Sequence, residues 1–99
     1  MPIYQITRDV PGWTQAELHA AAIRTQTCAA WFEGMEWIRS FHHPETGTLT
    51  CYYVAESDAD LRRHAEFSDV PCDEVRAVDE YLPMPADQFE PDKTLTSTR

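Results

Sequence analysis

Residues 35–56 read MEWIRSFHHPETGTLTCYYVAE, and this stretch decides the fold. It holds two runs rich in aromatic and β-branched side chains, residues 35–42 and residues 48–56, which is the composition of β-strands. Residues 44–47, PETG, lie between them and have turn-forming chemistry. Because the connection is this short, the pattern predicts an antiparallel β-hairpin.

Both faces of this predicted hairpin carry bulky apolar side chains. Strict alternation places Trp37 and Phe41 on one face of the first strand and Ile38 on the other. In the second strand, Cys51 and Tyr53 share one face. A sheet that is apolar on both faces requires a covering layer on each. We therefore expect helices on one face and a second copy of the protein on the other.

The segment before the hairpin predicts a strand followed by a helix. Residues 3–9, IYQITRD, are rich in β-branched and aromatic types. Thr14, followed three residues later by Glu17, is the signature of a capping box, which marks the N-terminus of a helix. The three-four spacing of apolar residues predicts that this helix covers residues 15–32, and Gly34 is a helix end signal.

The segment after the hairpin predicts a second helix and a last strand. We expect the helix over residues 59–68 and the strand over residues 74–82, with Pro71 breaking the chain between them. Helical spacing predicts one inner face made of Leu61, His64, Ala65 and Ser68. From residue 83 the chain is rich in proline and poor in apolar residues, so we expect one domain over residues 1–82 and an extended tail over residues 83–99.

The order strand, helix, strand, strand, helix, strand predicts an α+β fold of the ferredoxin-like type. In this βαββαβ fold, two helices cover one face of a four-stranded antiparallel sheet, and the strands are expected in the order four, one, three, two. This order places Arg8 beside the fourth strand, where we expect an ion pair with Glu80. The alternative role for Arg8 is to hold a carboxylate or an enolate in the mouth of a pocket.

The chain is acidic, with 8 Lys and Arg residues against 17 Asp and Glu residues and a formal charge of −9. Lys93 is the single lysine, whereas nucleic acids and anionic membranes bind clustered cations. The composition therefore excludes nucleic acids and anionic membrane surfaces as expected partners. A metal ion or a cationic partner fits this charge, although solubility alone also accounts for it.

The targeting and redox features predict a cytoplasmic protein. The sequence has no apolar run near the roughly 18 residues of a membrane span, and its N-terminus has no signal-peptide pattern. Its three cysteines, Cys28, Cys51 and Cys72, form no Cys-x-x-Cys pair, which predicts reduced thiols. No motif indicates an organic cofactor.

Five short segments occur in an order that resembles a known family. They are RDVPG at 8–12, WIRSF at 37–41, CYY at 51–53, RRHA at 62–65 and PCDEV at 71–75. Through these segments the chain resembles a family of small bacterial nickel-binding proteins that is otherwise described as a domain of unknown function. The resemblance covers residues 3–82. The resemblance implies a homodimer, paired through its sheets into an α+β barrel, that binds nickel or another divalent metal.

Related dimeric barrels include cofactor-free monooxygenases, isomerases and cyclases that act on aromatic or polyketide-like compounds. The resemblance therefore also implies an alternative, a small-molecule enzyme, and leaves open whether this protein catalyses a reaction. A third hypothesis, a dimeric interaction module without a ligand, requires neither a metal site nor a pocket.

His42, His43 and Glu45 are the predicted metal ligands. Imidazole and carboxylate groups suit nickel, copper or zinc, with water completing the coordination shell. Adjacent residues at a strand end point to opposite sides, so we expect one further ligand from elsewhere, for example from the partner subunit. The alternative is a pair of surface histidines without a physiological metal.

A ligand pocket is expected between the sheet and the helices. Its predicted residues are Trp37, Ser40, Cys51, Tyr53 and His64. Aromatic walls with a few polar groups suit a flat organic ligand. If the protein is an enzyme, His64 is the expected acid–base residue because imidazole titrates near neutrality, and Tyr53 or Arg8 orients the substrate. The alternative is that these side chains only form the core.

Overall fold

The computed structural model describes residues 1–82 and 86–88. Its elements, in chain order, are β1 (Ile3–Asp9), α1 (Gln15–Ala29), β2 (Glu36–His43), β3 (Thr48–Val54), α2 (Asp58–Ser68), β4 (Glu74–Val78) and a short 3-10 helix, η1 (Ala86–Gln88). The predicted βαββαβ order is confirmed. The expected tail over residues 83–99 lies outside the described residues except for η1.

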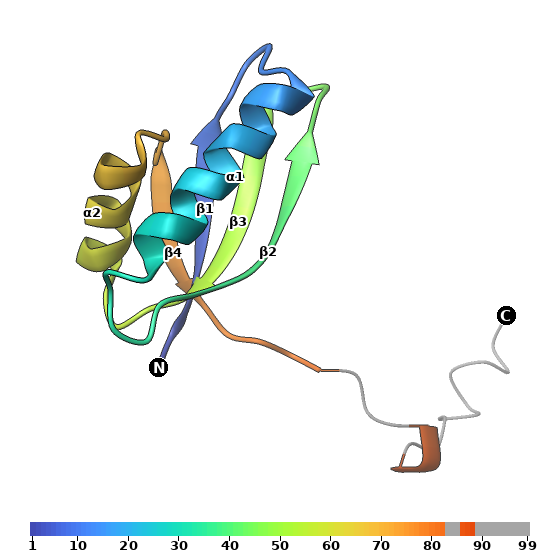
Figure 1. The fold of residues 1–99 in the computed structure, drawn as a ribbon. Coiled ribbons are helices and arrows are strands. Elements are labelled where there is room, and N and C mark those ends of the chain that lie inside the picture. Colours follow the sequence, from blue (N-terminus) through green and yellow to red (C-terminus); the bar gives the residue numbers. More distant parts are fainter. Residues whose placement is uncertain (83–85, 89–99) are drawn as a thin grey trace, which may run out of the picture.

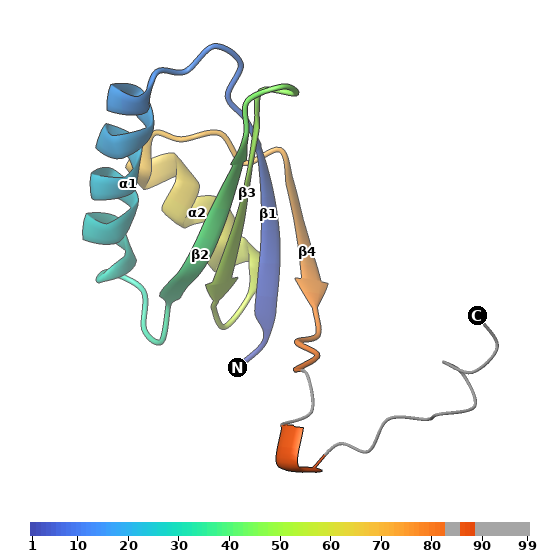
Figure 2. The ribbon, with the colours of Figure 1, turned by 90° about the vertical axis from the view of Figure 1, so that its right-hand side faces the viewer.

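The four strands form one antiparallel sheet with the order β2-β3-β1-β4. Both helices lie on the same face of this sheet, which we call the helix face (Figure 1). Seen edge-on, the opposite face carries no helix from the described residues, and we call it the open face (Figure 2). The predicted α+β class and the strand order four, one, three, two are both confirmed.

Helix α1 begins where the sequence predicts. The Thr14 side chain accepts a hydrogen bond from the Glu17 backbone N–H, and the Glu17 carboxylate accepts one from the Thr14 N–H. These bonds lower the pKa of Glu17. The helix ends at Ala29, earlier than expected, because the N–H groups of Trp31 and Phe32 bond to carbonyls three residues back and tighten the last turn into 3-10 geometry.

Helix α2 is held at both ends by side chains. The Ser57 hydroxyl accepts from the Asp60 N–H at its N-terminus. Its last turn contains no basic residue, but Arg24 of α1 donates to the carbonyls of Ser68 and Asp69 at 2.7 and 3.1 Å. A cation is stabilising at the C-terminal end of a helix dipole, so this contact ties the helices together. Neither helix of the described chain is long and apolar enough to cross a membrane.

Strand β2 departs from strict alternation. The β2–β3 register shifts between Trp37 and Arg39, which marks a β-bulge at Ile38. Because the bulge inserts one extra residue, Ile38, Arg39 and Phe41 all line the open face. Trp37 stays on the helix face together with Ser40. The prediction that Trp37 and Phe41 share a face is therefore wrong.

Strand β4 ends at Val78, earlier than expected. In the β1–β4 register Val78 pairs with Ile3, the first residue of β1, so the residues beyond Val78 have no partner strand. The same register contradicts the expected ion pair between Arg8 and Glu80. Antiparallel pairing carries Glu80 past Ile3, which lies at the other end of β1 from Arg8.

The core lies between the helix face and the two helices. Its central buried cluster comprises Ile6, Cys51, Tyr53, Ala55 and Leu61. The predicted inner face of α2 is confirmed, because Leu61, His64, Ala65 and Ser68 are all buried. The burial of Ile6 and Tyr53 fixes the register of the sheet, because a slip by one residue would turn both side chains toward the open face.

Replacing Thr14 by alanine should lower the free energy of unfolding by about 1 kcal/mol, because the Glu17 N–H loses its cap. Urea denaturation followed by circular dichroism measures this change. Thr27→Ala is the matched control, since Thr27 is exposed on the same helix and its hydroxyl donates to the Ile23 carbonyl within the helix. Equal losses in the two variants would contradict a specific role for the capping box.

Candidate functional site

A cavity of about 230 Å³ lies between α1 and the sheet, and we call it the α1–sheet cavity. Residues of α1, among them Leu18 and Thr25, form its helix wall. Its sheet wall consists of Trp37, Ser40, His42, Leu49, Cys51 and Tyr53. Four of the predicted pocket residues, Trp37, Ser40, Cys51 and Tyr53, are thus brought together around one cavity.

The bulge in β2 shapes the sheet wall of this cavity. It brings Trp37 and Ser40 to the same face, where the Trp37 indole N–H donates to the Ser40 hydroxyl at 2.9 Å. This bond uses the Ser40 oxygen as an acceptor and leaves its O–H proton for another acceptor. The cavity therefore combines an aromatic wall with a hydroxyl donor.

Arg8, Tyr53 and His64, the residues predicted to act in catalysis, form one buried cluster beside the cavity. The Tyr53 and His64 rings lie 5.4 Å apart between centroids. Burial raises the pKa of Tyr53, and the nearby Arg8 charge opposes this rise. Tyr53 lines the cavity, whereas Arg8 and His64 lie outside its lining. The fold therefore brings the three residues together, but only Tyr53 lines the cavity.

His64 is fully buried and links the two helices. Its Nε2–H donates to the Thr25 carbonyl of α1 at 2.8 Å, since a carbonyl oxygen can only accept. Burial lowers the pKa of His64 below its ordinary value of 6.5, the Arg8 charge adds to this effect, and the bond to Thr25 opposes it. Nδ1 is a buried acceptor without a partner among the described residues.

The cysteines lie in or near the core. Cys28 and Cys51 are buried, Cys72 is half-buried, and all three are free thiols. Burial raises the pKa of Cys72, which favours the uncharged and less reactive form of its thiol. Cys51 lines the α1–sheet cavity, where it contributes an apolar surface.

The predicted metal ligands do not form one group within a single chain. His42 lines the α1–sheet cavity on the helix face. His43 lies on the open face, where its Nε2 is 3.4 Å from the Thr50 hydroxyl, and Glu45 is exposed in the turn between β2 and β3. Among the described residues, no three His, Cys, Asp or Glu side chains are arranged to hold a metal ion. One described chain alone therefore does not fit a nickel site with three protein ligands.

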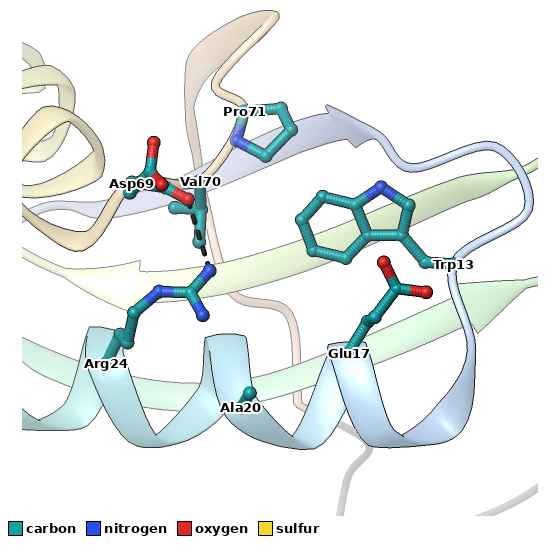
Figure 3. A pocket seen from close by; sticks show the side chains of 7 residues that line it. All are labelled: Trp13, Glu17, Ala20, Arg24, Asp69, Val70 and Pro71. Carbon is teal, nitrogen blue, oxygen red and sulfur yellow. Dashed lines mark hydrogen bonds between the residues drawn. The ribbon is translucent and has the colours of Figure 1, made fainter.

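A larger hollow of about 580 Å³, the α1–α2 hollow, was not predicted from the sequence. Figure 3 shows Trp13 and Arg24 at its two ends, with the Glu17 carboxylate beside the Trp13 ring. Asp69 and Pro71 contribute from the segment after α2. No local sequence pattern marks this hollow because its two sides come from distant parts of the chain.

A third hollow, of about 400 Å³, lies on the open face. Phe41 and Tyr52 give it an apolar floor; Phe41 is 50% exposed, and its ring meets that of Tyr52 edge-on at 6.3 Å. Arg39 on one side and Asp79 with Glu80 on another add charges of both signs. This hollow occupies the apolar face that the sequence predicts to be covered by a second copy.

Fold and sites together define a small βαββαβ protein with an apolar sheet face left open and imidazole donors at its hairpin. The model of the SCO4226-like family, nickel responsive proteins, matches residues 4–78, and the chain belongs to this family. The predicted resemblance to a nickel protein family is thereby confirmed.

The crystal structure of SCO4226 from Streptomyces coelicolor A3(2) has the same fold. It matches with a TM-score of 0.72 and 21% sequence identity, covering 81% of this chain and 99% of that chain. At this identity the match supports the architecture alone. Among curated proteins, none matches the chain.

The lowered pKa of His64 predicts a loss of stability in acid. The folded state binds fewer protons than the unfolded state as the pH falls through about 6.5, so the free energy of unfolding decreases there. Urea titrations at about pH 7.5 and pH 5.5 should show a smaller decrease for His64→Gln than for the wild type. His19→Gln, at an exposed position, is the control and should keep the wild-type decrease. Identical decreases in all three proteins would rule out His64 as the source.

Proposed function

We propose that the protein is a nickel-binding homodimer in which the open faces of two sheets pack together into an α+β barrel. The observation that carries this proposal is the position of His43 on the same apolar face that a second copy would bury. Membership of a family described as nickel responsive supports nickel as the metal. We also propose that this role is cytoplasmic, which three cysteines without a Cys-x-x-Cys pair support.

The open face has the composition of an interface with an identical partner. Phe41 and Tyr52 expose aromatic surface there, and an exposed apolar patch is typical of an interaction site. Arg39, Asp79 and Glu80 give the same face both signs of charge. A twofold axis sets a patch against its own copy, so the cation of one subunit can meet the carboxylates of the other. A partner with charges of one sign only would leave part of the charge on this face unpaired.

A second copy also adds donors for nickel beyond those that the described residues of one chain bring together. His43 and Glu45 are exposed near one another in sequence, and imidazole and carboxylate groups are suitable nickel ligands. A dimer doubles the number of such donors, and water completes the coordination. The formal charge of −9 favours the approach of a divalent cation.

Catalysis in the α1–sheet cavity is the second candidate function. It would be the work of a cofactor-free isomerase, cyclase or monooxygenase on an aromatic or polyketide-like compound. The clustering of Arg8, Tyr53 and His64 beside an aromatic wall favours it. His64 weakens it, because its Nε2–H is bonded to a carbonyl and the ring lies outside the lining of the cavity.

Placing a carboxylate at Phe41 should dissociate the dimer, because Phe41→Glu buries an unpaired charge in the proposed apolar contact. Sedimentation equilibrium of the tag-free protein measures the mass in solution. Ile23→Glu is the matched control: Ile23 is exposed on α1, on the helix side, so this variant should remain dimeric. A wild-type protein that is monomeric at micromolar concentration would contradict the proposal.

Replacing both His42 and His43 by alanine should abolish stoichiometric nickel binding while the fold persists. Removing even a group that only orients a metal ligand costs about 10- to 100-fold in affinity, so the loss of a ligand should cost at least as much. Metal content of dialysed, tag-free protein and nickel titration calorimetry measure the effect.

The single variants His42→Ala and His43→Ala test the histidine on each face of the sheet separately. We expect His43→Ala to account for the loss, because His42 lines the α1–sheet cavity. His19→Ala is the control for an exposed histidine. Wild-type protein that holds no metal after dialysis and rebinds it only at millimolar concentration would refute the nickel role.

A further inference from the structure

Arg8 is a buried cation without a carboxylate partner in the part of the chain that the structure describes. The residue is 2% exposed. Its Nη1 donates to the Pro71 carbonyl at 2.6 Å, whereas its Nη2 has no hydrogen-bond partner among those residues. A guanidinium does not lose its proton in proteins, and a buried charge is costly unless it is paired. An anion placed near Arg8 would therefore be stabilised by this charge.

Arg8 adjoins the α1–sheet cavity. Across the β1–β3 pair it faces Leu49, which lines the cavity, and directly opposed residues lie about 5 Å apart between Cβ atoms. Tyr53, a second lining residue, also lies within the influence of the Arg8 charge. Charges in a protein interior are screened much less than charges in water, so an anion in this cavity would be attracted.

The lining of the α1–sheet cavity contains no Asp or Glu, although the chain has 17 acidic residues. Pro71, the acceptor of the Arg8 bond, lines the α1–α2 hollow, where Glu17 and Asp69 outweigh the charge of Arg24. On the open face, Asp79 and Glu80 likewise outweigh the charge of Arg39. The distribution of charge therefore directs an anion to the α1–sheet cavity.

The volume and lining of the cavity indicate what the ligand contains besides its negative charge. Its volume of about 230 Å³ is small for a ligand site and suits one ring with a short substituent. Trp37 and Leu49 provide apolar walls for such a ring. Ser40 supplies a donor, because its oxygen already accepts from the Trp37 indole and its proton is left for a ligand oxygen.

We propose that the α1–sheet cavity binds a small organic carboxylate with a single flat ring. Ser40 donates a hydrogen bond to the carboxylate, Trp37 contacts the ring, and the buried guanidinium of Arg8 supplies the opposing charge. This site is separate from the metal and dimer proposals, because its residues lie on the helix face and bind without nickel.

Trp37 is a built-in reporter for the test. Trp13→Phe and Trp31→Phe, made together, leave Trp37 as the single tryptophan. Fluorescence is then titrated with benzoate and with its neutral analogue benzyl alcohol, on protein freed of metal by dialysis. We expect saturable binding of benzoate. Benzyl alcohol should bind at least about tenfold more weakly, because it carries no charge to interact with Arg8. Calorimetry on the wild type checks that the tryptophan substitutions do not alter the result.

Arg8→Met should weaken benzoate binding at least about tenfold while leaving benzyl alcohol nearly unchanged, and Ser40→Ala should weaken benzoate binding by a similar factor. Arg62→Met is the matched control, because Arg62 is exposed on α2 next to Asp58. Ser40→Ala keeps the test decisive if Arg8→Met does not fold. Three results would overturn the proposal: no saturable binding of benzoate, equal affinity for the two probes, or wild-type benzoate affinity in a folded Arg8→Met or Ser40→Ala protein. Nickel-loaded protein should bind benzoate equally, whatever the fate of the metal proposal.

Discussion

The apolar open face of the sheet is the constraint on which the rest of the structure depends. Within the described residues both helices cover the helix face, so the aromatic surface of Phe41 and Tyr52 on the other side requires another layer. The bulge at Ile38 strengthens this requirement, because it turns Ile38 and Arg39 to the open side together. The same face carries His43. In the proposed dimer, assembly and metal binding therefore share one surface.

On the helix face, polar side chains join the layers through backbone carbonyls. Arg24 bonds to the end of α2, His64 bonds to Thr25 of α1, and Arg8 bonds to the Pro71 carbonyl. Such bonds satisfy donors but neutralise no charge, which is why Arg8 stays a buried cation beside a cavity free of carboxylates. The two faces of the sheet thus differ in chemistry: the open face carries charges of both signs, whereas the interior beside the helix face holds the buried cation Arg8.

The fold could be predicted from local signals, whereas the details of the site depended on pairing between distant strands. The capping box of Thr14 and Glu17 predicted the start of α1, and helical spacing predicted the buried face of α2. The bulge at Ile38 could not be predicted, because it exists only in the register with β3. The wrong partner for Arg8 has a similar cause: β4 ends at Val78 because β1 begins at its pairing partner. Hence four of the five predicted pocket residues line one cavity while His64 lies outside its lining, and the α1–α2 hollow, built from distant segments, was not predicted.

The most direct test of the central claim is anomalous diffraction at the nickel edge from crystals of tag-free protein grown with stoichiometric nickel. We expect two sheets packed through their open faces and a nickel peak within bonding distance of the His43 imidazole, with donors from both copies. A peak whose protein ligands all come from one chain, or open faces that do not meet in the dimer found in solution, would contradict the central claim.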